Sequence, residues 1–139
     1  MTDSLQPEPQ LRSTAVAEVA DRLFAAIENG DAATVEALWA DDVLVWKSAE
    51  PEEQAKKRAL RVIAWFMDIT TSRRYEILDR QFFDGGFVQQ HILHANGRNG
   101  GLIAMRVCIV IKVGADGLIN RIDEYFDPAG IAPLLESTN

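Results

Sequence analysis

Apolar residues divide the chain into a helical first half and a second half made of strands. Intervals of three and four residues, typical of one helix face, occur over residues 13–28, over 52–69, and from Asp31 to the pair Asp41-Asp42. The segment 60–67 is apolar on most sides, so we expect that end of its helix to be deeply packed. In the first segment the repeating residues are Val16, Val19, Ala20, Leu23, Phe24 and Ile27.

Beyond residue 70 the pattern changes to the alternation of β-strands. We predict strands at 43–47, 75–83, 87–95, 102–113 and 118–127, joined by turns rich in Gly, Asn and Asp. Pairing Val113 with Leu118 across the last turn places Val107 opposite Glu124. Helices followed by a long antiparallel meander predict an α+β fold, in which the helices cover the concave face of one curved antiparallel sheet.

Composition narrows the classes of function. The net charge of −7, without a basic stripe, argues against binding nucleic acid. No apolar run approaches the ~18 residues of a membrane span, and the one cysteine, Cys108, is compatible with a reducing cytoplasm. We predict a disordered lead at residues 1–12 and a single domain over 13–135, located in the cytoplasm. We find no nucleotide-binding loop and no hydrolase elbow, and we predict no cofactor and no metal.

The strongest hint of chemistry is Glu124 in the final strand. Alternation places it with Ile122 and Phe126 on the more apolar face of that strand. A carboxylate among apolar neighbours has a raised pKa and can act as a general acid or base. The alternative is a structural glutamate that is paired with Lys47 or with an amide.

The partner of Glu124 is less clearly marked. His94 shares a strand face with Val88, Gln90 and Ile92, and if that face points inward His94 can exchange protons with Glu124. Simple hairpin pairing instead favours Gln90, and His94 is then a rim residue bonded to the backbone. Gln90, His94 and Lys47 all stay open as partners. We expect His91, on the other face, at the surface or in a dimer interface.

Four stretches carry a resemblance to a known family: FAAIENGD at 24–31, LWADDV at 38–43, GFVQQH at 86–91 and DGLINRIDEYFD at 116–127. The chain resembles the SnoaL-like branch of the nuclear transport factor 2-like superfamily, which includes polyketide cyclases, limonene epoxide hydrolases and ketosteroid isomerase-like proteins. In the epoxide hydrolases of this group an acid precedes Tyr-Phe-Asp, as Glu124 does here. The positions of their other site residues hold Val45, Lys47, Ile92 and His94, which are different residue types.

The resemblance implies a cone-like half-barrel with an apolar pocket and a homodimer formed through the convex sheet face. It implies a small apolar ligand, polycyclic or terpenoid, and cofactor-free isomerase, cyclase, hydratase or epoxide hydrolase-like chemistry. Glu124 and His94 are then the candidate catalytic residues. The alternatives are a non-catalytic ligand-binding domain and a dimeric association domain. The expected pocket-lining residues are Phe24, Ile27, Val45, Lys47, Trp65, Phe66, Gln90, Ile92, Met105, Val107, Ile122 and Phe126.

Overall fold

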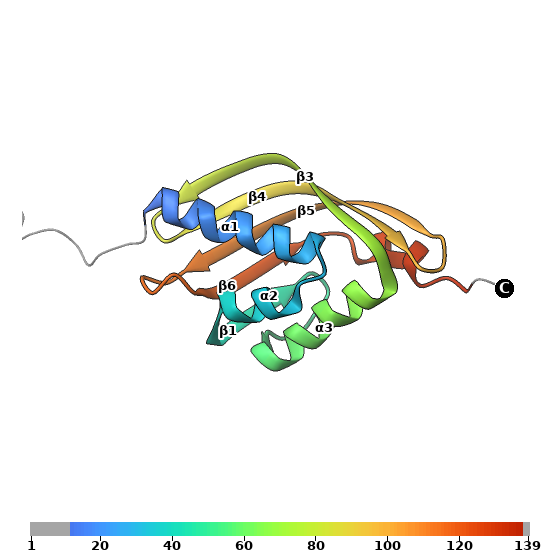
Figure 1. Ribbon diagram of the computed structural model, residues 1–139, viewed down its shortest axis with the longest axis horizontal. Helices are drawn as coiled ribbons and strands as arrows, with labels where there is room; N and C mark the ends of the chain where they lie inside the picture. Colours follow the sequence, from blue (N-terminus) through green and yellow to red (C-terminus); the bar gives the residue numbers. More distant parts are fainter. Residues whose placement is uncertain (1–11, 138–139) are drawn as a thin grey trace, which may run out of the picture.

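The computed structural model describes residues 12–137 and begins with two helices that meet at a sharp turn (Figure 1). Helix α1 (Ser13–Glu28) has the predicted bounds. Helix α2 (Ala32–Leu38) is capped by Asp31, whose carboxylate accepts a hydrogen bond from the Thr34 N–H at 3.1 Å. Between the helices Gly30 adopts a φ of +69°, which favours glycine and lets the chain reverse direction.

Helix α2 ends earlier than the sequence predicts. Trp39, expected on the inner face of this helix, is the first residue of strand β1 (Trp39–Lys47), so Asp41 and Asp42 lie in a strand. Helix α3 (Lys56–Ile69) also starts later than predicted, because the preceding residues form the short strand β2 (Gln54–Ala55) paired with β1. In both places strand pairing with distant residues overrides the local helical pattern.

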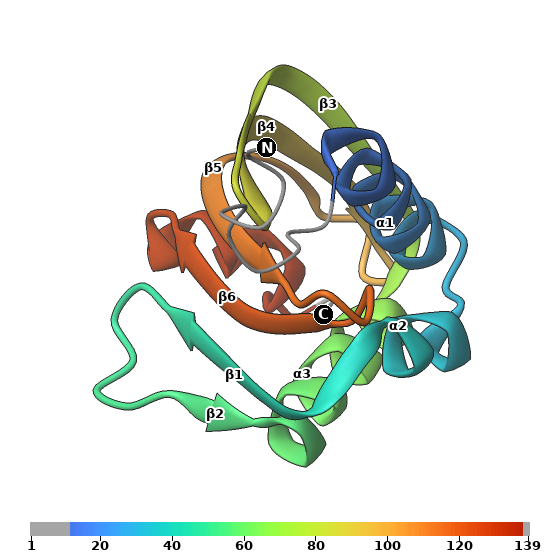
Figure 2. The same ribbon diagram turned by 90° about the vertical axis from the view of Figure 1, so that its left-hand side faces the viewer.

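Within the described residues the sheet has six strands in the order β2-β1-β6-β5-β4-β3. Strand β1 is parallel to β6 and all other neighbours are antiparallel, so the sheet is mixed rather than wholly antiparallel as predicted. Figure 2 shows how strongly it curves. The strands of the second half are β3 (Thr70–Phe83), β4 (Gly86–Gly97), β5 (Leu102–Val113) and β6 (Ile119–Tyr125).

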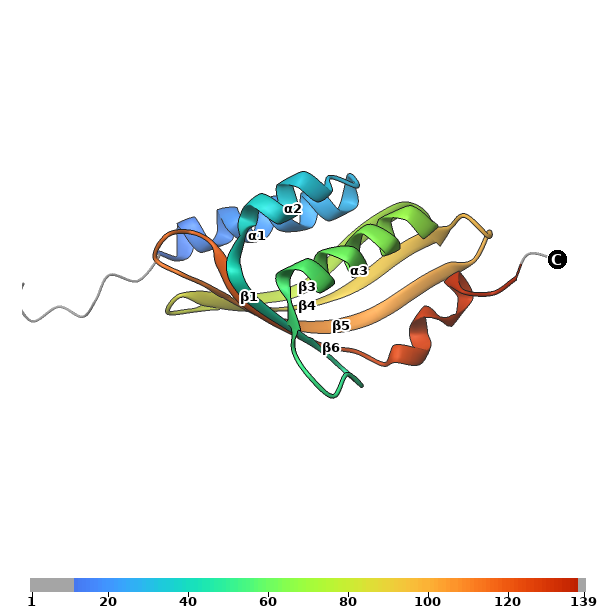
Figure 3. The ribbon, with the colours of Figure 1, turned by 90° about the horizontal axis from the view of Figure 1, so that it is seen from below.

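The helices lie on the concave side of this sheet, as Figure 3 shows from below. Leu23 and Phe24 of α1 are buried together with Val107, Ile109 and Ile111 of β5 in one apolar core. These residues leave water because the apolar stripe of α1 packs on the concave face of the sheet, where β3 and β4 are its nearest strands. The predicted α+β half-barrel with helices on its concave face is therefore confirmed.

Helix α3 is less deeply packed than its apolar second half predicts. Of its residues, all within the described range, only Ala59 is buried, and the Trp65 side chain is 45% exposed. The reason is that α3 stands above a cavity, which Val62, Ile63 and Phe66 help to line. Part of its apolar face therefore borders the cavity, while Leu60, Met67 and Ile69 pack partly buried against the core.

A register shift in β6 changes which of its residues face inward. Glu124 pairs with Ile109 and not with Val107, and the pairing slips between Lys112 and Val113. Past this irregularity Ile119, expected on the polar face, is fully buried. A bulge inserts one residue and exchanges the two faces of a strand, which an alternating pattern does not reveal. Glu124 keeps its predicted inward orientation because it lies on the regular side of the shift.

A second irregularity, between Ile77 and Asp79, has the same effect in β3. Before it, Tyr75 faces the helices. After it, the face changes and Arg80 points inward, paired with Gln89 of β4. Strand β3 thus contributes both an odd-numbered and an even-numbered residue to the concave side.

The described chain ends in a 3₁₀ helix, η2 (Pro128–Leu134), whose first turn is capped by the Asp127 carboxylate. No helix between residues 12 and 137 combines the length and the apolar character needed to cross a membrane. The predicted lead at residues 1–12 lies outside the described residues, apart from Arg12.

Candidate functional site

A cavity of about 140 Å³ lies between α1, α3 and the concave face of the sheet. Its walls are mainly aliphatic and aromatic, so water inside it gains few hydrogen bonds and an apolar ligand can displace it. Most of the residues expected to line a pocket lie in its wall: Phe24, Ile27, Val45, Lys47, Trp65, Phe66, Met105, Ile122 and Phe126.

Three predicted lining residues lie elsewhere. Val107 is buried in the core and does not reach the cavity. Gln90 and Ile92 alternate with the inward-facing residues of β4 and so point to the convex side, where Gln90 is exposed. The prediction that the face of Gln90 and Ile92 points inward is therefore wrong.

His94 lies on the convex side as well. Its Nε2 is 2.8 Å from the Glu76 carboxylate on β3, and the pair is partly exposed to solvent. His94 cannot reach the cavity through the sheet, so its predicted proton exchange with Glu124 is excluded by position. The structure brings His91 into the cavity instead.

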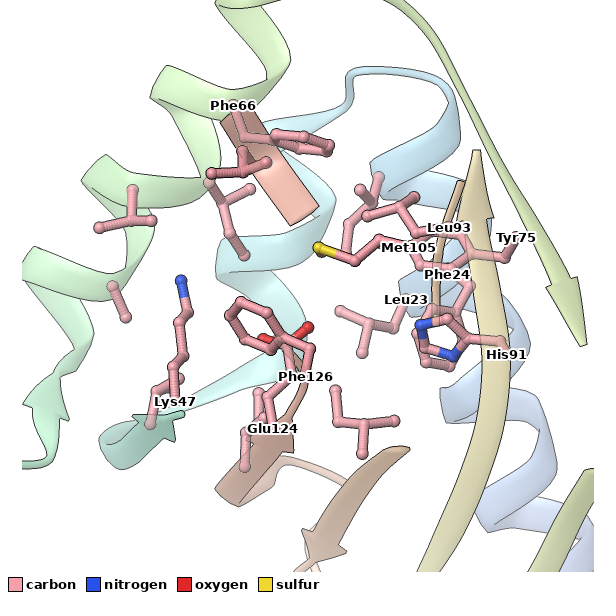
Figure 4. Close-up of a pocket in the computed structure, with 18 of the residues that line it drawn as sticks. Leu23, Phe24, Lys47, Phe66, Tyr75, His91, Leu93, Met105, Glu124 and Phe126 are labelled. Atoms are coloured by element: carbon pink, nitrogen blue, oxygen red, sulfur yellow. The ribbon is translucent and has the colours of Figure 1, made fainter. Parts of the chain in front are cut away.

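Glu124 occupies the predicted position, with its carboxylate in the cavity (Figure 4). It stands between Ile109 of the antiparallel strand β5 and Lys47 of the parallel strand β1. No side chain among residues 12–137 forms a hydrogen bond or an ion pair with this carboxylate. Burial raises the pKa of Glu124, and the positive charge of Lys47 offsets part of that rise.

Lys47 lines the same cavity and is half-buried. Figure 4 shows its ammonium group on the side of Glu124 that faces α3. The two charged groups influence each other without a contact of 4 Å or less. Lys47 is thus a neighbour of Glu124, whereas the predicted structural salt bridge is not formed.

His91 lies opposite, on β4, and is only 1% exposed. It pairs with Val107 of β5, and its ring packs edge-on against Phe24 and Tyr75, with centroids 5.7 and 4.9 Å away. His91 was expected at the surface or in a dimer interface, but it is buried and lines the cavity on the concave side. The alternating residues of β4 are equally mixed on both faces, so only its pairing with the apolar face of β5 could have revealed the inward side.

A chain of hydrogen bonds runs from the surface to His91. The Asp21 carboxylate accepts from Arg80 Nη1 at 2.8 Å, and Arg80 Nε donates to Gln89 Oε1 at 2.7 Å. Gln89 Nε2 then lies 2.9 Å from His91 Nδ1. Arginine has no acceptor atom, so the Gln89 oxygen must accept from Arg80 and the Gln89 NH₂ must donate to His91. His91 Nδ1 is therefore an acceptor, and the ring proton is on Nε2.

The charge state of His91 follows from the same surroundings. Burial, followed by the positive charge of Arg80, lowers the pKa of His91 from 6.5 to about 4, so the ring is neutral at physiological pH. Its Nε2 is buried and has no hydrogen-bond partner among the described residues. Sequence reasoning did not find this group, because Arg80 reaches Gln89 only through the bulge in β3.

Tyr75 completes the polar part of the wall. Burial, with smaller contributions from Glu124 and Glu28, raises the pKa of its phenol far above the usual range, so it remains a neutral donor. Its backbone N–H donates to the Glu28 carboxylate at 2.8 Å, which fixes β3 to the end of α1. Between residues 12 and 137 no cluster of three His, Cys, Asp or Glu side chains is placed to hold a metal ion.

Comparison with solved structures places this fold among known proteins. An LEH-like epoxide hydrolase of M. tuberculosis superimposes with a TM-score of 0.72 at 19% identity, over 88% of this chain and 90% of that one. PrhC from Penicillium brasilianum gives 0.77 at 15% identity over 88% and 86%. IdmH, a putative polyketide cyclase from Streptomyces antibioticus, gives 0.70 at 15% identity over 86% and 96%. At these identities the likeness establishes a common fold.

Sequence comparison gives the family. Curated proteins provide no match to the chain. The model of the SnoaL-like domain, however, matches residues 20–122, which extend from the middle of α1 to the inward-facing part of β6. The match thus includes most of the cavity wall and ends two residues before Glu124. The chain belongs to the SnoaL-like family.

Proposed function

We propose that this protein binds a compact, mainly apolar small molecule in the cavity and catalyses proton transfer on it without a cofactor. The observation that carries the proposal is the half-buried Glu124 carboxyl group, which lines an apolar cavity and accepts no hydrogen bond from any described residue. A buried carboxyl is costly, and a raised pKa brings it closer to the working range of a general acid or base. Glu124 is the proton-transferring group in this proposal.

Cavity size limits the ligand. At about 140 Å³ the cavity is close to the engineered cavity of ~150 Å³ that accommodates benzene, and it is smaller than the ~300 Å³ at which drug-sized pockets begin. A small monocyclic molecule fits a cavity of this size. A polycyclic ligand requires a wider cavity than this one.

The arrangement suits reactions in which one carboxyl group gives and takes a proton. Ionised Glu124 can remove a proton from a carbon next to a carbonyl group, and the resulting acid can return it at another atom. The same group can remove a proton from water during hydration or the opening of an epoxide. Isomerisation, cyclisation, dehydration and hydration are thus the reaction classes that we propose. Lys47 stabilises the ionised form of Glu124 by its charge.

Exchange of hydrogen for deuterium tests this proposal before the natural substrate is known. Neutral monocyclic and bicyclic ketones and enones are incubated with the protein in D₂O, and incorporation next to the carbonyl is followed by NMR. We expect catalysed exchange that Glu124→Gln reduces about 10²- to 10⁴-fold. Glu76→Gln, at the convex carboxylate beside His94, is the matched control and retains activity. Full activity in Glu124→Gln would remove the assigned role.

A hydrolysis assay with small terpene epoxides extends the same test to the second reaction class. Hydrolysis of the epoxides without exchange in the ketones would keep Glu124 as the base, but one that takes its proton from water. Tight binding of both classes with every molecule recovered unchanged would instead favour a non-catalytic ligand-binding domain.

We further propose that the protein forms a homodimer through the convex sheet face. Val88, Ile92 and Val110 are only half-buried there, and the Tyr125 side chain is 49% exposed beside Trp46. Such an apolar face is suited to a second copy of the chain. Analytical ultracentrifugation tests this, and Val110→Lys is expected to give a monomer.

A further inference from the structure

The His91 side of the cavity holds a donor without an acceptor. His91 is 1% exposed, its Nε2 has no partner among the described residues, and Nε2 is on the side of the ring away from Gln89. Figure 4 shows the imidazole directed from β4 into the pocket. Buried polar groups in proteins are nearly always satisfied. Nε2 belongs to a residue that lines the cavity, so an atom of a bound ligand is a partner that could satisfy it.

The direction of this donor is fixed from behind. Gln89 has no freedom to rotate its amide, because its oxygen is held by Arg80 Nε and its NH₂ group by His91 Nδ1. Arg80 is itself fixed by Asp21 and lies over the rings of Phe24 and Phe87 at 5.9 and 5.6 Å. A charged guanidinium cannot lose its proton, so the whole chain has one hydrogen-bond polarity. The result is a proton at Nε2.

We propose that Gln89 and Arg80 are positioning residues that hold neutral His91 as a hydrogen-bond donor to an oxygen atom of the ligand. The ligand class is then an uncharged apolar molecule with one carbonyl or ether-type oxygen at its His91 end. This deepens the proposed function, since the ligand occupies the same cavity, but it does not depend on catalysis by Glu124. His91 would anchor the oxygen and polarise it, while Glu124 faces the reacting carbon or water.

Charge and spacing support this ligand class. A neutral donor attracts an anion less than an imidazolium does, and Glu124 on the other wall repels one. His91 on β4 and Glu124 on β6 are separated by the single strand β5 and by an offset of two residues along it, which together correspond to roughly 12 Å between their backbones. Both side chains extend into the cavity, so one compact molecule can contact both groups.

The tautomer can be measured directly. Long-range ¹H–¹⁵N NMR distinguishes the two ring nitrogens of a histidine, and His94→Gln leaves His91 as the only histidine of the chain. We expect the Nε2–H tautomer across neutral pH. In Gln89→Glu the new carboxylate accepts from Nδ1–H, which moves the proton away from Nε2. A Nδ1–H tautomer in the otherwise native protein would overturn the proposal.

A matched pair of probes tests the ligand class. Acetophenone and cumene have the same heavy-atom skeleton, but only acetophenone has a carbonyl oxygen. We expect acetophenone to shift the His91 Nε2 resonance and cumene to leave it unchanged. The ratio of acetophenone to cumene affinity should fall about two- to tenfold in Gln89→Glu, the range for one neutral hydrogen bond. Binding of acetophenone without a Nε2 shift, or no saturable binding up to its solubility, would contradict the proposal.

Glu124→Gln separates this inference from the proposed function. If both hold, the variant loses proton exchange but keeps the Nε2–H tautomer and the acetophenone shift. If only the donor role of His91 holds, exchange is the same in the variant and in the native protein while the NMR results persist. Loss of the tautomer or of the shift in the native protein counts against the donor role alone.

Discussion

The two polar walls of the cavity are built in opposite ways. On the β4 side, His91 is the end of an unbroken hydrogen-bond chain through Gln89 and Arg80. On the β6 side, Glu124 has no such support among the described residues, and Lys47 acts on it only from beyond ion-pair distance. One wall is fixed in geometry and proton position. The other is free to change its protonation state, which is what a proton-transferring group needs.

The same physical cause shifts the pKa of the two groups in opposite directions. Burial disfavours the charged form, so it lowers the pKa of His91 to about 4 and raises the pKa of Glu124. Both shifts favour the uncharged form of the group concerned. The difference is that a second charge, Arg80, strengthens the effect at His91, whereas Lys47 weakens it at Glu124.

The largest expected effect is on acid stability through His91. Unfolded histidine binds a proton below pH 6.5, but native His91 does so only below about 4. The contribution of His91 to the free energy of unfolding is therefore full above pH 6.5 and is lost as the pH falls to 4. The loss is roughly 3 kcal/mol for the difference between a pKa of 6.5 and one of about 4. Urea unfolding between pH 7 and 4, in a Glu124→Gln background, measures it. His91→Gln in this background should remove the loss of stability, and the His94→Gln control should keep it. Equal slopes of stability against pH in the background and in both variants would contradict the assignment of the loss to His91.

Removing Gln89, the middle residue of the hydrogen-bond chain on the β4 side, should have the next largest effect on stability. Gln89→Leu leaves both Arg80 Nε and His91 Nδ1 buried without a partner, which we expect to lower the unfolding free energy by about 1–3 kcal/mol. Chemical denaturation at neutral pH measures the change. Gln90→Leu, one residue away on the exposed face, is the control and should change stability little. Similar losses in both variants would indicate a general effect on β4.

The free wall should respond in the opposite sense. Because the native pKa of Glu124 is raised above 4.5, stability decreases as the pH rises from 4.5 through the native pKa. Glu124→Gln should therefore be more stable than the native protein at neutral pH, and this gain should disappear below pH 4.5. We expect a smaller effect than at His91 because Lys47 offsets part of the shift. Thermal unfolding at several pH values measures it, and a loss of stability at pH 7 would reveal a stabilising ion pair instead.

The smallest effect is expected at Asp21, the outer end of the hydrogen-bond chain that leads to His91. The Asp21 side chain is 69% exposed, so Asp21→Asn weakens a solvent-screened ion pair and should cost about 0.2–1 kcal/mol. The His91 tautomer should not change, since Arg80 still donates to Gln89. Unfolding in low and high salt, together with the NMR experiment, checks both statements. A tautomer change in this variant would mean that Asp21 is needed to hold Arg80.

Elements whose pattern is local were predictable from the sequence. The bounds of α1 and β5 agree with the prediction, because each has one uninterrupted apolar face. The inward position of Glu124 was predictable for the same reason. Local pattern also gave the helical half and the hairpins of the second half, from which the fold class follows.

The His91 wall was not predictable. Odd and even positions of β4 both mix apolar and polar residues, so the inward face depends on pairing with β5, and the predicted choice of Gln90, Ile92 and His94 was wrong. The link from Arg80 to Gln89 additionally requires the bulge in β3. These contacts are set by tertiary pairing, about which a residue's sequence neighbours carry little information.

The irregularity between Ile77 and Asp79 adds one residue to β3 and so exchanges the two faces of the strand beyond it. Before it the odd-numbered residues of β3 face the concave side of the sheet, and after it the even-numbered residues do. In a family member without the extra residue of this bulge, a neighbour of Arg80 would lie opposite Gln89. The sequence on either side could still be similar. Alignments of relatives should therefore allow a gap or an insertion at this bulge before Arg80 is compared. The donor role of His91 is expected only in chains that keep the bulge.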